Sequence, residues 1–243
     1  MKKIIFWTTL ISVVGLLIGA CAKRDDDKAT KQWTKFSCED TTASGSIPIG
    51  SDTVSGTYLV QTWSDYYLSR SATGCNATTE HYGSPTGTQS VLLKRIVTSS
   101  TSFVDYEGYY SDTACTSRLG YIQKRYVNVS VGDQVSGLDN STGRPTSGYK
   151  VTYNGECGKV MGDTDAATAA INTSHSYLFR FNLLTTGTEM VFNLGFGGLA
   201  NTSYDIWGAG DNGTTYSFYS SRGSTQSPPS DWDTNSGGNT YQR

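Results

Sequence analysis

The sequence predicts a nearly all-β domain, built as an antiparallel barrel or sandwich. The chain has 243 residues, of which 27 are Gly, 16 are Tyr and 8 are Phe, and only 16% are charged. Short segments with apolar residues at every second position alternate with runs of Gly, Asn, Ser and Thr. Such a pattern is typical of many short strands, in which Tyr covers a half-buried sheet face while its hydroxyl reaches water.

The N-terminus precedes this domain and has a different character. Lys2 and Lys3 are followed by an apolar run from Ile4 to Leu17, and small residues lead up to Cys21. This pattern resembles the lipobox signal peptide of bacterial lipoproteins. A retained transmembrane helix is the alternative, but the run is shorter than the ~20 residues that a spanning helix needs. The resemblance implies that residues 1–20 are removed and that Cys21 carries a diacylglycerol and an acylated N-terminus.

The residues after Cys21 predict a tether and a location in the outer membrane. Ala22 follows the Cys, whereas enterobacterial lipoproteins kept in the inner membrane usually have Asp there, so the resemblance implies the outer membrane. The lipid-anchored chain would face the periplasm or the cell surface. The segment 21–35 is polar and of mixed charge, as expected of a tether between the lipid and a domain spanning residues 36–220.

The predicted strands follow one another at short intervals from residue 56. Each combines β-branched or aromatic residues with a spacing near two and ends at Gly, Asn, Asp or Ser. Asn154-Gly155 predicts a hairpin turn, because both residues tolerate positive φ. The expected strands are 56–63, 90–97, 103–110, 121–131, 149–153, 176–184, 189–196, 204–207 and 214–219.

Two segments depart from the β pattern. Asp163 and Thr164 suit a helix N-cap and precede an Ala-rich run to Ile171, so one short helix is expected over 163–171. The segment 221–243 lacks apolar periodicity and is expected to be disordered.

Four cysteines remain beyond the anchor: Cys38, Cys75, Cys115 and Cys157. An even number in an exported chain predicts two disulfides, because compartments outside the cytoplasm are oxidising. Spacing alone leaves three pairings open. The absence of a Cys-x-x-Cys pair argues against zinc.

Two of these cysteines belong to a wider resemblance. Gly56-Thr57-Tyr58, Cys75 and the motif from Tyr109 to Cys115 (Tyr-Tyr-Ser-Asp-x-x-Cys) are similar to the lipocalin-like domain of the adenomatosis polyposis coli down-regulated family. The similarity covers about residues 56–155, and Tyr58 stands where that family has Trp. It implies a lipocalin-like barrel that holds an apolar ligand, with Cys75 linked to Cys115 and Cys38 left for Cys157.

The sequence offers little for catalysis, and no cofactor is expected. His81 and His175 are the two histidines, and neither a Gly-x-Ser-x-Gly elbow nor a His-Glu-x-x-His zinc helix is present. A hydrolase would therefore need one of them to meet a Ser and a carboxylate in space. Asp163 and Asp165 do not continue into an EF-hand, because Ala167 and Thr168 occupy the next expected Asx and Gly positions, so no metal site is expected.

Binding is thus the expected class of function. The leading hypothesis is a membrane-anchored, non-catalytic lipoprotein whose β domain binds a small apolar or amphipathic ligand; the alternative is a surface adhesin or glycan-binding module. A formal net charge of −2 argues against nucleic acid as a partner. Aromatic side chains serve either function, although Tyr is also an ordinary strand residue. The candidate ligand-binding residues are Tyr58, Trp63, Tyr66, Tyr109 and Tyr110.

Overall fold

A computed structural model describes residues 38, 42–62, 75–77, 84–138, 145–178, 183–194, 202–211, 216–222 and 239–242. These residues belong to one compact unit, Cys38–Arg243. The expected signal peptide, Cys21 and the tether lie outside the described residues, as do Trp63, Tyr66 and His81. No helix within the described part of the chain has the length and apolar character needed to cross a membrane.

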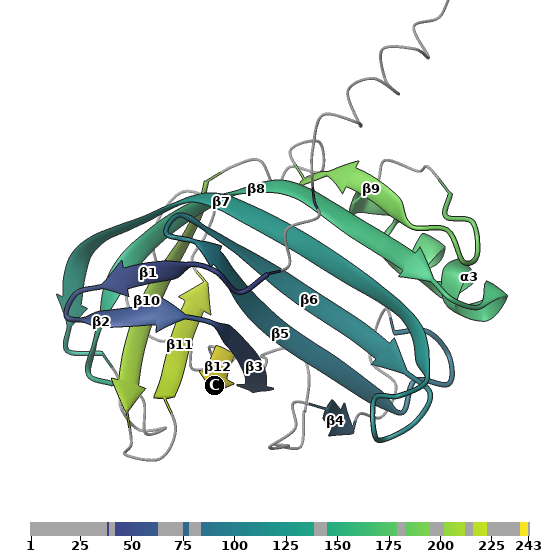
Figure 1. Ribbon diagram of the computed structural model, residues 1–243, viewed down its shortest axis with the longest axis horizontal. Helices are drawn as coiled ribbons and strands as arrows, with labels where there is room; N and C mark the ends of the chain where they lie inside the picture. Colours follow the sequence, from purple (N-terminus) through teal and green to yellow (C-terminus); the bar gives the residue numbers. More distant parts are fainter. Residues whose placement is uncertain are drawn as a thin grey trace, which may run out of the picture. The chain divides into compact units, whose positions relative to one another are not determined.

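The fold is predominantly β, as predicted, and all described strand pairs are antiparallel (Figure 1). A two-stranded hairpin, β1 (Ser46–Ile49) and β2 (Asp52–Ser55), precedes a ten-stranded sheet. The strands of that sheet are β3 (Thr57–Thr62), β4 (Cys75–Ala77), β5 (Ser90–Ser99), β6 (Ser102–Tyr110), β7 (Arg118–Ser136), β8 (Ser147–Gly162), β9 (Met190–Asn193), β10 (Ser203–Asp211), β11 (Tyr216–Arg222) and β12 (Asn239–Gln242).

The strand pairings close on themselves. In chain order, β3, β5, β6, β7, β8, β10, β11 and β12 each pair with the next, and β12 pairs back with β3. One half of β8 pairs with β10 and the other half with β9, while β4 lies on β5. Among the described strands this is the order of an up-and-down barrel. Closure matters because it gives every strand in the ring a partner on both sides and encloses an inner face.

Two sequence predictions about the strands are wrong. Ser176–Leu178, expected to begin a strand, is the short 3-10 helix η1. Asn154 and Gly155 do not turn but lie within β8, opposite Val127 and Tyr126, beside a register shift in the pairing with β7. Neither residue adopts a positive φ; the residue that does so at this irregular point is Asn128 on β7, where the extra residue of the strand pair lies.

The C-terminal prediction is also wrong in part. Within the segment expected to be disordered, β11 continues to Arg222, and Asn239–Gln242 forms β12 between β11 and β3. This strand is polar and has no apolar periodicity. Backbone hydrogen bonds to two neighbours place it in the sheet, and that pairing is invisible to a search for hydrophobic spacing.

The predicted helix is present as α3 (Asp165–Ser174). Thr164 is its N-cap, and the Thr164 hydroxyl oxygen accepts a hydrogen bond from the backbone N–H of Ala167 at 3.2 Å. The buried face of α3 includes Thr168 and Ile171 and packs beside the C-terminal end of β8 (Figure 1). The cap and the Ala-rich run thus predicted the helix correctly.

Both disulfides pair as the family resemblance implied. Cys38 is linked to Cys157 and Cys75 to Cys115. The first joins the start of the compact unit to β8, and the second joins β4 to the loop between β6 and β7. Each therefore fixes a peripheral segment to the ring of strands.

Candidate functional site

Side-chain contacts between strands that do not pair identify the inner face of the ring. The ring centroid of Phe103 on β6 lies 5.1 Å from that of Tyr153 on β8 and 5.5 Å from that of Trp207 on β10. β7 separates β6 from β8, and both β7 and β8 separate β6 from β10. These three aromatic side chains can meet only by crossing the interior, so they define its wall.

The strand register also places charged residues on the inner face. Phe103 lies opposite Tyr126 on β7, and two residues further along β6 Asp105 lies opposite Lys124. Asp105 also lies opposite Arg95 on β5. Because paired residues share a face and alternate residues return to it, Arg95, Asp105 and Lys124 all lie on the inner wall. The next inner position on β6 is Glu107.

The inner wall is aromatic near Phe103. Tyr126 stacks on Phe103 with ring centroids 4.9 Å apart, and Tyr153 packs edge-on against both. Asp205 is 1% exposed, and its Oδ2 accepts hydrogen bonds from the Tyr153 hydroxyl and the Trp207 Nε1–H, each at 3.0 Å. These bonds allow polar aromatic groups to pack in a buried layer.

The wall becomes charged beside this aromatic layer. Arg95 donates from Nε and Nη2 to the two carboxylate oxygens of Asp105, each at 2.7 Å, and the Arg95 guanidinium lies 4.2 Å over the Phe103 ring. The Asp105 side chain is nevertheless 25% exposed, and Glu107 and Lys124 are half-buried. Exposed fractions of this size on an inward-facing wall mean that side chains do not fill the whole interior.

A histidine lies near this charged part of the wall. Burial lowers the pKa of His175; the Glu107 carboxylate opposes that shift and the Lys124 ammonium adds to it. The His175 Nδ1 is 2.7 Å from the Ser174 hydroxyl, which also donates to the Ala170 carbonyl at 2.8 Å. His175 is the C-cap residue of α3, so this Ser–His contact joins neighbours in the chain at a helix end.

Glycines on the inner wall allow α3 to approach. A Cβ atom on Gly162 would lie 2.3 Å from the Thr168 hydroxyl oxygen, and one on Gly120 would lie 3.1 Å from Cδ1 of Ile171. Both glycines lie at the same level of the wall, because they are register partners on β7 and β8. The helix therefore packs on this part of the inner wall where it carries no side chains.

The predicted binding tyrosines divide between the two faces of the sheet. Tyr58 lies opposite Arg95 in the β3–β5 register, and Tyr109 follows Glu107 by two residues, so both belong to the inner wall. Both are 0% exposed, and the Tyr109 hydroxyl donates to Oε1 of Glu107 at 2.9 Å. Tyr110 is 7% exposed and lies on the opposite face.

Sequence reasoning missed the inward charges. Their signal was present as the alternation Phe103-x-Asp105-x-Glu107 and as Lys124 on a strand whose two faces both mix polar and apolar residues. Without the pairing, such residues are expected on the solvent side of a strand. The registers of β5, β6 and β7 were needed to place them inside.

On the outer face, aromatic rings cover one another. Tyr106 stacks on Tyr121 with centroids 5.6 Å apart, the Lys94 ammonium lies 4.7 Å over Tyr106, and the Arg118 guanidinium lies 4.7 Å over Tyr121. The Tyr121 hydroxyl also donates to Glu189. This arrangement leaves these two rings little open face on which a sugar could stack.

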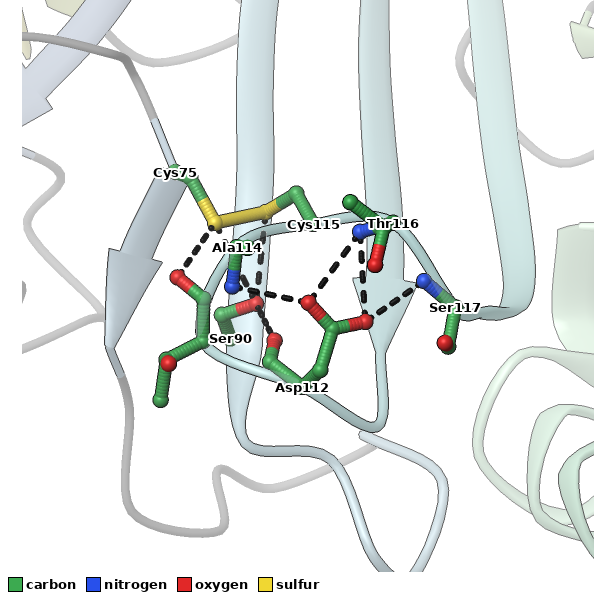
Figure 2. Close-up of a disulfide and its surroundings, with 8 residues drawn as sticks. Cys75, Ser90, Asp112, Ala114, Cys115, Thr116 and Ser117 are labelled. Carbon is green, nitrogen blue, oxygen red and sulfur yellow. Dashed lines mark hydrogen bonds between the residues drawn. A yellow bond between two sulfur atoms is a disulfide. The ribbon is translucent and has the colours of Figure 1, made fainter.

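The loop after β6 has a well-defined polar frame (Figure 2). The Asp112 carboxylate accepts backbone N–H groups from Ala114 at 2.8 Å and from Ser117 at 2.5 Å. The bond from Ser117 is the largest influence that lowers the Asp112 pKa to about 2. The Ser90 hydroxyl lies 3.4 Å from the Cys75 sulfur (Figure 2). The loop thus holds Cys115 where it can reach β4.

Within the part of the chain that the structure describes, no three His, Cys, Asp or Glu side chains are grouped so that they could hold a metal ion. No protein-family model matches the chain, and no curated protein matches it. The function is therefore inferred from the inner wall itself.

Proposed function

We propose that this chain is a non-catalytic, lipid-anchored protein of the bacterial outer membrane whose β domain binds a small amphipathic ligand inside the ring of strands. The lipobox-like segment ending at Cys21 supports the anchor and the location. The partly exposed charges on the inner wall support the binding role.

The observation that supports the binding role best is the 25% exposure of the Asp105 side chain on a wall that otherwise buries aromatic rings. A protein interior is normally packed to the density of an organic crystal. Charged groups are placed inside only where solvent, a partner or a ligand compensates the loss of hydration. An aromatic layer next to a charged layer matches a molecule with one apolar and one polar end.

The experiment uses residues 22–243, which contain the whole compact unit Cys38–Arg243, exported to an oxidising periplasm. We expect the neutral apolar dye N-phenyl-1-naphthylamine to fluoresce on binding this protein and to be displaced by single-chain amphiphiles. A native mass that exceeds the denatured mass would identify a carried ligand. A protein with both disulfides formed that neither binds the dye nor carries extra mass would contradict the proposal.

The location has a separate test. Mass spectrometry of the N-terminal peptide from the full-length chain should find a diacylglycerol and an acyl chain on Cys21, and Cys21→Ala should release the protein from the outer-membrane fraction. An unmodified Cys21 in wild-type protein would overturn the anchor while leaving the binding role open to the dye experiment.

A further inference from the structure

We infer that the interior recognises an amphiphile with an anionic head group and that the Lys124 ammonium is the cation that binds it. This inference rests on the proposed binding role. Lys124 lies on β7 and faces the interior between two register partners, Asp105 on β6 and Gly158 on β8. Its side chain is half-buried, and no hydrogen bond or ion pair connects its ammonium with any residue that the structure describes.

In the part of the chain that the structure describes, neither neighbouring carboxylate forms an ion pair with Lys124. Both carboxylate oxygens of Asp105 accept hydrogen bonds from Arg95 at 2.7 Å. Across β5, β6 and β7 the row Arg95, Asp105 and Lys124 therefore carries one excess positive charge. Glu107, one inner position away on β6, accepts the Tyr109 hydroxyl at 2.9 Å and keeps its negative charge, so it offsets this excess from a neighbouring position without forming an ion pair with Lys124. A half-buried ammonium in this setting gains from an anionic partner, because charge-assisted hydrogen bonds are stronger than neutral ones.

The surroundings of Lys124 supply an apolar wall for the rest of such a molecule. Gly158, opposite Lys124, has no side chain, and the Phe192 ring covers it, since a Cβ there would lie 2.3 Å from Cζ of Phe192. The next inner layer along β7 holds Tyr126 stacked on Phe103. An anionic group at Lys124 would thus be followed by apolar rings for a hydrocarbon chain. The ligand class is a single-chain amphiphile with a carboxylate or phosphate head, of which a fatty acid is the simplest member.

The test compares head groups on one chain length. Dodecanoic acid, dodecyl phosphate, dodecanol and dodecylamine displace N-phenyl-1-naphthylamine from residues 22–243, and each affinity is expressed relative to dodecanol. We expect both anions to bind more tightly than dodecanol and the amine less tightly. The Lys124→Met variant keeps the apolar stem and removes the charge. It should lower the anion-to-dodecanol affinity ratio by about tenfold, which corresponds to about 1.4 kcal/mol.

Controls separate this inference from the proposed function and from misfolding. Lys124→Arg should keep the anion preference, and Lys150→Met, at an exposed position on β8, should leave the ratio unchanged. Urea unfolding of every variant establishes that the fold is intact. If all four amphiphiles bind but Lys124→Met leaves the ratio unchanged, the inference is overturned and the binding role stands. If neither dye nor amphiphile binds wild-type protein, both are overturned. Whichever of dodecanoic acid and dodecyl phosphate binds more tightly identifies the head group that the interior prefers.

Discussion

Replacing Gly162 by Ala tests the contact between α3 and the inner wall. A Cβ at residue 162 would lie 2.7 Å from Cα and 2.8 Å from N of Thr168, whereas ordinary contact begins at 3.4 Å. These are backbone atoms, so no side-chain rotation relieves the overlap, and α3 must shift by about 0.7 Å. The shift disturbs Ile171, which is 0% exposed. Overpacking of this kind costs about 1–3 kcal/mol.

The assay is urea unfolding of the purified domain, followed by far-ultraviolet circular dichroism. The midpoint for Gly162→Ala should fall without a change in slope, and the melting temperature should fall by about 2–4 °C per kcal/mol. Gly132→Ala on β7 is the matched control, because a Cβ there meets its nearest neighbour, the Lys150 carbonyl oxygen, at 3.6 Å. It should be neutral or stabilising by up to about 1 kcal/mol. Equal midpoints for the two variants would refute the packing of α3 on β8.

Three further predictions concern single features. Replacing Cys75 and Cys115 together by Ala should destabilise the domain by about 4 kcal/mol, the loop-closure value for a separation of 40 residues; an unchanged urea midpoint would argue against that loop being constrained. Because the folded Asp112 carboxyl has a pKa of about 2, its stabilising contribution should be complete above pH ~4 and disappear as the pH falls toward 2. Asp112→Asn should therefore flatten that part of the stability profile, and an unchanged profile would contradict the hydrogen-bond frame. Burial lowers the folded pKa of His175, so below pH ~6.5 the unfolded chain binds a proton that the folded chain does not. The free energy of unfolding should therefore fall as the pH drops from about 7 to 5, and it should fall less in the His175→Gln variant. Parallel pH profiles for wild-type protein and this variant would show that the imidazole is not desolvated.

Local features of the sequence predicted much of the local structure. Period-two spacing predicted strands such as Phe103–Tyr110, and the N-cap residue Thr164 with the Ala-rich run that follows it predicted α3. These signals are carried by a few consecutive residues, whose backbone preferences and burial pattern do not depend on distant partners. The even number of cysteines likewise predicted two disulfides, and the family resemblance implied their pairing.

Tertiary pairing decided the rest. Asn239–Gln242 joins the sheet only because β3 and β11 both offer backbone groups, and Asn154-Gly155 continues a strand because β7 pairs beyond it. The same registers turn Lys124 and Asp105 inward, although a lone strand would present them to water. The sequence alone predicts where most of the longer strands lie. Which face of each strand looks inward follows from long-range hydrogen bonding, since a shift of one residue exchanges the two faces.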